Sequence, residues 1–160
     1  MELTFHTDYA LRVLTYLGLR PGRLCLIADI AEHYRISRNH LVKVVHRLAR
    51  GGFVRTYRGK GGGVTLARAP GEINVGAVVR CTEGPVRLVE CFRGEDNTCV
   101  ISGACMLAGM LQEACENFLV TLDRYTLADL LTRRARLSRM LALPPLSEEP
   151  RRELPRHSTG

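Results

Sequence analysis

Hydrophobic residues recur every three or four positions through the first fifty residues, the spacing that places them on one face of an α-helix. The first such stretch runs from Leu3 to Leu19 and is broken by Pro21 and Gly22. From 26 to 50 the pattern predicts two more helices, the second beginning after Ser37 and ending at Gly51. The Ser37 hydroxyl is expected to cap that helix. Helices arranged in this way are typical of a helix-turn-helix.

The pattern changes after Gly52, where two short segments rich in β-branched and aromatic residues follow, FVRTY at 53–57 and VTLAR at 64–68. The segment between them, RGKGGG, allows the positive φ angles of a tight loop because most of its residues are glycine. We therefore expect a β-hairpin wing, and with it a winged helix-turn-helix DNA-binding domain over residues 1–72. The expected fold class is mainly α with a small β-hairpin.

Residues 73–142 are expected to form a second part of the chain. The pattern predicts a helix at 73–81, an irregular loop at 83–103 and a long helix at 104–122 with apolar residues on one side. One small domain offers little to cover that side, so we expect a second copy of the helix to do so in a homodimer. Packing on its own domain alone is the alternative. Two short helices follow up to 141, and the tail at 143–160 is predicted to be disordered.

Charge is distributed unevenly along the 160 residues, whose formal net charge is +7. Between Glu32 and Glu72 there is no acidic residue, while nine Lys and Arg side chains occur. Such a positive field suits a phosphate backbone or an anionic membrane, and a basic solvated surface is the other interpretation. No stretch is long and apolar enough to span a membrane, and the first residues do not resemble a secretory signal, so a cytoplasmic protein without membrane contact is expected.

The helix that follows Ser37 is expected to lie in the major groove of double-stranded DNA, with the wing beside it. The residues predicted to contact DNA are Ser37, Arg38, Asn39, His40, Lys43, Arg47, Arg58 and Lys60. The first four begin the helix and are predicted to face base edges, since Arg pairs with guanine and Asn with adenine. The next two are predicted to hold phosphates, and the last two, in the wing, to enter a minor groove or hold the backbone.

Three of the six cysteines lie close together in the predicted loop, with seven residues between Cys91 and Cys99 and five between Cys99 and Cys105. A zinc ribbon is disfavoured because structural zinc usually has paired cysteines and four Cys or His ligands, and no histidine lies between His46 and His157. Three thiolates on a flexible loop suit an iron-sulfur cluster with one iron left to another ligand. Zinc or another single metal ion, and redox thiols without a metal, remain open.

Five features in order resemble the NsrR family of nitric-oxide-sensing repressors and, more distantly, its relative IscR. They are LTFHTDYALRVLTYL, SRNHLVKVVHRLARGGFV, RGKGGGVTLAR, the three clustered cysteines and LDRYTLADL, and the resemblance extends over about residues 1–141. The resemblance implies a homodimeric transcriptional repressor whose cluster-loaded form binds a palindromic operator. It also implies that the protein leaves DNA when nitric oxide attacks the cluster.

The resemblance assigns Cys91, Cys99 and Cys105 as cluster ligands and implies that Asp8 of the partner subunit completes the coordination. A 4Fe-4S cluster is favoured. A 2Fe-2S cluster is possible, because the first gap between cysteines, seven residues, is longer than is usual in the family and leaves the cluster size open. Asp8 has a second interpretation, as a surface acid paired with Arg12 four residues on.

Two other regulators fit the same residues, an IscR-like sensor of iron-sulfur or redox status and a cluster-free thiol-redox regulator. An enzyme is not expected. The sequence has no phosphate-binding loop, no Ser-His-Asp set and no dinucleotide fingerprint.

Overall fold

The computed structural model describes residues 2–59, 61–85 and 87–147. Lys60 and residues 148–160, which include most of the tail predicted to be disordered, lie outside them. The described chain is mainly helical with one two-stranded antiparallel sheet, so the predicted fold class is confirmed. No helix in this part of the chain has the length and apolar character needed to cross a membrane.

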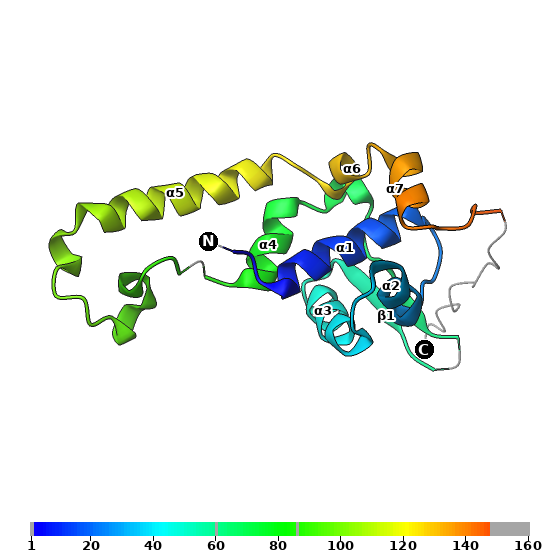
Figure 1. The fold of residues 1–160 in the computed structure, drawn as a ribbon, viewed down its shortest axis with the longest axis horizontal. Coiled ribbons are helices and arrows are strands. Elements are labelled where there is room, and N and C mark those ends of the chain that lie inside the picture. Colours follow the sequence, from blue (N-terminus) through cyan, green and yellow to red (C-terminus); the bar gives the residue numbers. More distant parts are fainter. Residues whose placement is uncertain (1, 60, 86, 148–160) are drawn as a thin grey trace, which may run out of the picture.

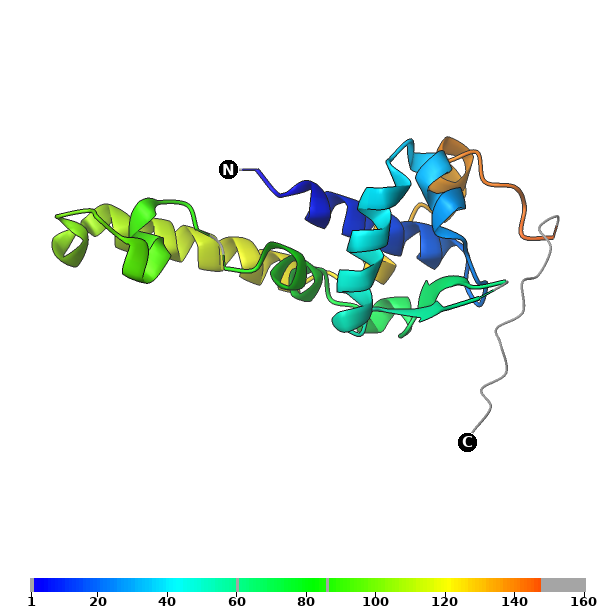
Figure 2. The same ribbon diagram turned by 90° about the horizontal axis from the view of Figure 1, so that it is seen from below.

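The helix-turn-helix is built from α2 (Ile27–Tyr34) and α3 (Arg38–Arg50), both packed on α1 (Phe5–Leu19). Arg35 adopts a left-handed conformation with φ of 54° at the end of α2, which turns the chain toward α3. Figure 2 shows α3 in cyan crossing α1 in blue. Ser37 stands at the N-cap position of α3 as predicted, but its side chain makes no capping hydrogen bond. Because Ser37 is exposed, water can satisfy the amides of the first turn instead.

The predicted wing is present as a hairpin of β1 (Val54–Tyr57) and β2 (Gly63–Leu66). Val54 pairs with Leu66 and Tyr57 with Gly63, so the two strands are fully in register. The tip between them includes Gly59 and Gly61, which have φ angles of 92° and 91°. A side chain at either position would be strained, which is why the sequence needs glycine there.

The helices α1, α2 and α3 together with the hairpin form a unit that we call the DNA-binding head. One hydrophobic core joins this head to α4 (Val75–Glu83). Amphipathic spacing explains its composition, because each helix contributes residues three or four apart and turns its polar residues outward. The fully buried residues at its centre include Val13, Leu14, Leu41, Val44, Leu48, Val64 and Val78.

The helix α5 (Met106–Asp123) projects from this body as an arm, with the loop that carries the three clustered cysteines at its far end (Figure 1). Its near end is held to α4 by an Arg80–Asp123 ion pair and by a 2.7 Å hydrogen bond from Asn74 Nδ2 to the Asp123 carbonyl. The loop has no strand in its described residues and forms two short 3-10 turns, at Glu90–Asp96 and Ser102–Ala104. The short helices α6 (Leu127–Leu130) and α7 (Arg134–Met140) then return the chain to α1.

Replacing Leu14 by Ala should lower the free energy of unfolding by about 2 to 5 kcal/mol, because it opens a cavity in a fully buried part of α1. Urea unfolding followed by circular dichroism at one fixed protein concentration measures this loss. Leu130→Ala, at a residue that is 38% exposed, is the matched control and should change the free energy by about 0.5 kcal/mol or less. Equal effects of the two substitutions would contradict the placement of the core.

Candidate nucleic-acid interface and cysteine loop

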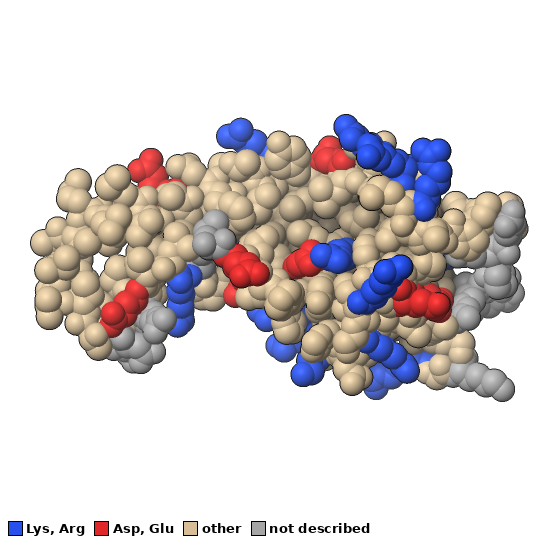
Figure 3. Space-filling model, viewed as in Figure 1, with Lys and Arg blue, Asp and Glu red and all other residues tan. Residues whose placement is uncertain are grey.

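One face of α3 carries the polar and basic side chains, and the opposite face is buried. Leu41, Val44, Val45 and Leu48 are almost fully buried, which fixes the helix on α1. Arg38, Asn39, His40, Lys43 and Arg47 are all exposed on the other side. Because α3 contains no acidic residue, this face can approach a phosphate backbone without repulsion. In Figure 3 the Lys and Arg side chains gather along the lower edge of the molecule, over α3, and around α7.

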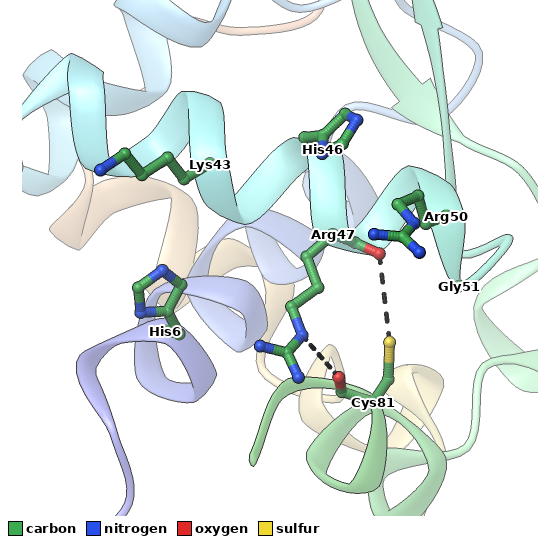
Figure 4. Close-up of a pocket in the computed structure, with 7 residues that line it drawn as sticks. All are labelled: His6, Lys43, His46, Arg47, Arg50, Gly51 and Cys81. Carbon is green, nitrogen blue, oxygen red and sulfur yellow. Dashed lines mark hydrogen bonds between the residues drawn. The ribbon is translucent and has the colours of Figure 1, made fainter. Parts of the chain in front are cut away.

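A hollow lies beside the C-terminal half of α3, between that helix, the first turn of α1 and the end of α4 (Figure 4). Its lining residues are His6, Lys43, His46, Arg47, Arg50, Gly51 and Cys81. Arg47 Nε donates a 2.7 Å hydrogen bond to the Cys81 carbonyl, so the guanidinium that was predicted to hold a phosphate is oriented by α4. Sequence reasoning missed His6, because only the packing of α1 on α3 brings it to this hollow from a distant part of the chain.

The wing places Arg58 at its tip, where the side chain is exposed next to Gly59. Lys60, the other predicted contact of the wing, lies outside the described residues. Arg55 on β1 is also exposed and adds a positive charge to the hairpin. The wing and α3 therefore both present basic side chains to solvent.

The structure places Cys91, Cys99 and Cys105 on one loop, and each is a half-buried free thiol. Cys91 lies in the first 3-10 turn, and Cys105 stands at the N-cap position of α5. Within residues 2–59, 61–85 and 87–147 no three His, Cys, Asp or Glu side chains are close enough together to hold a metal ion. The loop thus carries a thiolate donor set that suits iron, zinc or a cluster, and the three sulfurs are not gathered around one point.

The hydrogen bonds described for this loop are short-range. The Thr98 amide donates to Glu90 Oε1 at 3.0 Å, and the Cys99 amide donates to Asn97 Oδ1 at 3.0 Å. Gly94 has a φ of 65°, which separates the two parts of the first turn. A loop organised by such local bonds can rearrange its thiols around a bound group without breaking the core.

Asp8 forms an ion pair with Arg12 of its own helix, with 2.7 Å between Oδ2 and Nη2. The Arg12 guanidinium also lies 5.9 Å from the ring centroids of both Tyr9 and Tyr34. Burial raises the pKa of Tyr34 to about 12, so its phenol stays neutral beside this pair. The pairing predicted as the second interpretation of Asp8 is therefore present, and its role as a ligand in the partner subunit stays a prediction.

The arm exposes large hydrophobic side chains along much of its length. Met106, Leu107, Met110 and Val120 of α5 are 51 to 81% exposed. In the adjoining loop Val100 and Ile101 are 97 and 60% exposed. Cys115 is buried, but the rest of the apolar stripe of α5 is only partly covered by its own chain. An apolar surface of this kind marks a site of protein association.

The fold and the basic face of α3 define a winged helix-turn-helix protein that binds DNA. The sequence profile of the Rrf2 family, described as iron-dependent transcriptional regulators, matches residues 3–133, and the chain belongs to this family. It is therefore a DNA-binding transcriptional regulator and not an enzyme.

The relatives of this chain include proteins named HTH-type transcriptional regulator NsrR. The one from Halalkalibacterium halodurans is 48% identical over 146 residues, which are 91% of this chain and 100% of the relative. The one from Bacillus subtilis is 49% identical over 144 residues, which are 89% and 99% of the two chains. The predicted resemblance to NsrR is thus confirmed.

Solved structures have the same fold. A putative transcriptional regulator from Listeria innocua matches with a TM-score of 0.65 and 29% identity, over 82% of this chain and 86% of that one. T. potens IscR matches with a TM-score of 0.64 and 24% identity, over 83% and 88% of the two chains, a likeness of fold alone.

Arg38→Ala is expected to weaken binding to a selected operator while leaving binding to an unrelated duplex almost unchanged, because Arg38 is predicted to face a base edge. Lys43→Ala is expected to weaken binding to both duplexes and to lower the slope of log affinity against log salt by about one, the signature of one lost phosphate contact. Fluorescence anisotropy over a range of salt concentrations measures both. Identical behaviour of the two variants would show that these roles are wrongly assigned.

Proposed function

We propose that this protein is a homodimeric repressor that holds an iron-sulfur cluster through Cys91, Cys99 and Cys105 and leaves its operator when nitric oxide reacts with that cluster. The observation that carries the proposal is the position of three free, half-buried thiols on a single loop at the end of the α5 arm of a DNA-binding head. The relatives named NsrR support it. A 4Fe-4S cluster is favoured, and a 2Fe-2S cluster is the alternative.

The exposed apolar side of α5 supports the homodimer. A second copy of the same helix would bury Met106, Met110 and Val120 and remove this apolar surface from water. Winged-helix heads in a two-fold dimer meet two operator half-sites about 10 base pairs apart, or a multiple of that distance. The operator is accordingly expected to be palindromic.

Three thiolates are an incomplete set of protein ligands for a cluster. When bound, the cluster would supply an iron whose remaining position is held by a weaker ligand, and nitric oxide can react there. Asp8 of the partner subunit is the residue proposed for that position, which requires it to leave the Arg12 ion pair. Because the Asp8 side chain is about half exposed, it can leave Arg12 for another ligand without a steric clash.

Three successive residues at the end of α4 bind the DNA-binding head just before the cysteine loop begins. The Cys81 carbonyl accepts from Arg47 of α3 at 2.7 Å, and the buried hydroxyls of Thr82 and Thr7 are 2.7 Å apart. Glu83 Oε1 accepts from the amide and the hydroxyl of Thr4, at 2.7 and 3.0 Å. We call residues 81–83 the junction segment. Gly84, with φ of 72°, follows the junction segment, ends α4 and begins the cysteine loop.

The junction segment gives the loop a direct mechanical connection to α1 and α3. A change in the loop that pulls on Gly84 acts first on these hydrogen bonds. Their loss would release Arg47 and the start of α1 from α4, and would change the fit of each head to its half-site. This is a two-state account in which the cluster favours the arrangement that fits the operator.

Purified under anaerobic conditions and reconstituted, the protein is expected to contain iron and sulfide and to lose its visible absorption on titration with nitric oxide, with parallel loss of affinity for a duplex that it selects from a random pool. Cys91→Ser, Cys99→Ser and Cys105→Ser should each lower the iron content strongly. Cys81→Ser is the matched control for iron content, because Cys81 lies at the junction segment and not in the loop.

Two results would contradict the proposal. If the protein held no iron after reconstitution, zinc binding or metal-free thiol chemistry would be the remaining roles for the three cysteines. Equal operator affinity with and without the cluster would exclude the switch. Operator release on loss of a 2Fe-2S cluster, without a response to nitric oxide, would identify an IscR-like sensor instead.

Glu83→Ala is expected to leave the iron content unchanged and to bring the operator affinities of the cluster-loaded and cluster-free forms closer together, because the bonds to Thr4 are lost. Loss of two such hydrogen bonds corresponds to about 1 to 3 kcal/mol, or a factor of about 5 to 150 in the affinity ratio. Glu32→Ala, an exposed acid on α2, carries the same charge change and should preserve the ratio. A ratio unaltered by Glu83→Ala would show that the junction segment does not transmit the signal.

A further inference from the structure

The hollow beside α3 contains basic side chains that are not among the predicted DNA contacts. Of the described residues that line it, five are basic, namely His6, Lys43, His46, Arg47 and Arg50, and none is acidic. We call it the basic hollow. Figure 4 shows that it is built by three elements, since α3 supplies four of these side chains, α1 supplies His6, and α4 supplies Cys81.

The basic hollow continues the face of α3 that is predicted to meet DNA. Residues 43, 46, 47 and 50 are three and four positions apart, so they form one stripe along the helix. Asn39 lies four positions before Lys43 on the same stripe. A duplex whose base edges met the first turn of α3 would therefore run its backbone past the hollow.

Two features prepare the hollow for an anion. The hydrogen bond from Arg47 Nε to the Cys81 carbonyl holds the guanidinium at the edge of the hollow, and an arginine has four further N–H donors. Glu83, the acid of the junction segment, is bound to Thr4 and does not line the hollow. An anion placed there would meet hydrogen-bond donors from both α1 and α3.

We infer that the basic hollow binds one phosphate of the DNA backbone, and that His6, His46 and Arg50 contact it beside Lys43 and Arg47. Phosphate oxygens accept hydrogen bonds from imidazole and guanidinium groups, and such contacts fix the position of a protein on the duplex without reading sequence. His6 would then bring α1 into the DNA interface. The inference depends on DNA binding by α3 and not on the cluster, so it can be tested separately from the proposed switch.

The test compares Arg50→Ala and His6→Ala with the wild type at equal iron content, on a selected duplex and on an unrelated duplex. Arg50→Ala is expected to weaken binding to both duplexes alike, by about ten-fold, and to lower the salt slope by about one. His6→Ala should weaken binding to both by about three-fold. Arg136→Ala removes an exposed charge of α7, away from the hollow, and should leave affinity unchanged. All three residues are exposed, so melting followed by circular dichroism should be the same for every variant.

A backbone probe identifies the phosphate. Methylphosphonate, which is uncharged, is placed at one backbone position at a time; at the contacted position it should weaken the wild type and have little further effect on Arg50→Ala. Unchanged DNA affinity in both variants, or a loss confined to the selected duplex, would overturn the inference. So would stabilisation of the wild type by inorganic phosphate that Arg50→Ala abolishes without any change in DNA affinity, since the hollow would then bind a free anion.

Discussion

Burial of α1 is the constraint on which the rest of the molecule depends. Val13 and Leu14 are completely buried, and the helix packs against α3, α4, α6 and the hairpin. Gly18 allows Leu131 to pack against the far end of α1, because a Cβ there would lie 2.5 Å from Leu131 Cδ1. The helices α2 and α3 pack on α1, and so does α4, which holds the base of the arm. A change in how one of these elements packs on α1 therefore affects the others.

Local periodicity was enough to predict the helices, the hairpin and the irregular loop. Each of these depends on neighbours in sequence, such as the apolar spacing of α3 or the glycines at the wing tip, and those neighbours are visible in one chain. The capping role given to the Ser37 side chain was wrong in a way that the sequence could not show. A serine at an N-cap position either turns to the helix or faces water, and its surroundings in three dimensions decide between them.

The candidate site was predictable only where its residues are close in sequence. The spacing of Cys91, Cys99 and Cys105 places them on one loop, but the distances between their sulfurs depend on what the loop encloses. His6 escaped prediction because a residue on α1 meets Lys43 and Arg47 only through the packing of two helices. For Asp8 the local pattern was informative, because the i, i+4 rule predicted its ion pair with Arg12. The same rule says nothing about a contact with a second subunit.

The junction segment at the end of α4 links the basic hollow to the cysteine loop. Cys81 lines the basic hollow and orients Arg47, while Thr82 and Glu83 bind Thr7 and Thr4, which lie on either side of His6 in the sequence. A shift of this segment would move the two sides of the hollow relative to each other. Hydrogen bonds join these three residues to α1, Thr4 and α3, and the loss of three of them at about 1 kcal/mol each amounts to about 3 kcal/mol, or roughly a hundred-fold in affinity. That is the size of coupling expected between an effector site and a binding site in one protein. In the proposed switch a small movement at the end of α4 is therefore sufficient to change DNA binding, and the core around α1 need not rearrange.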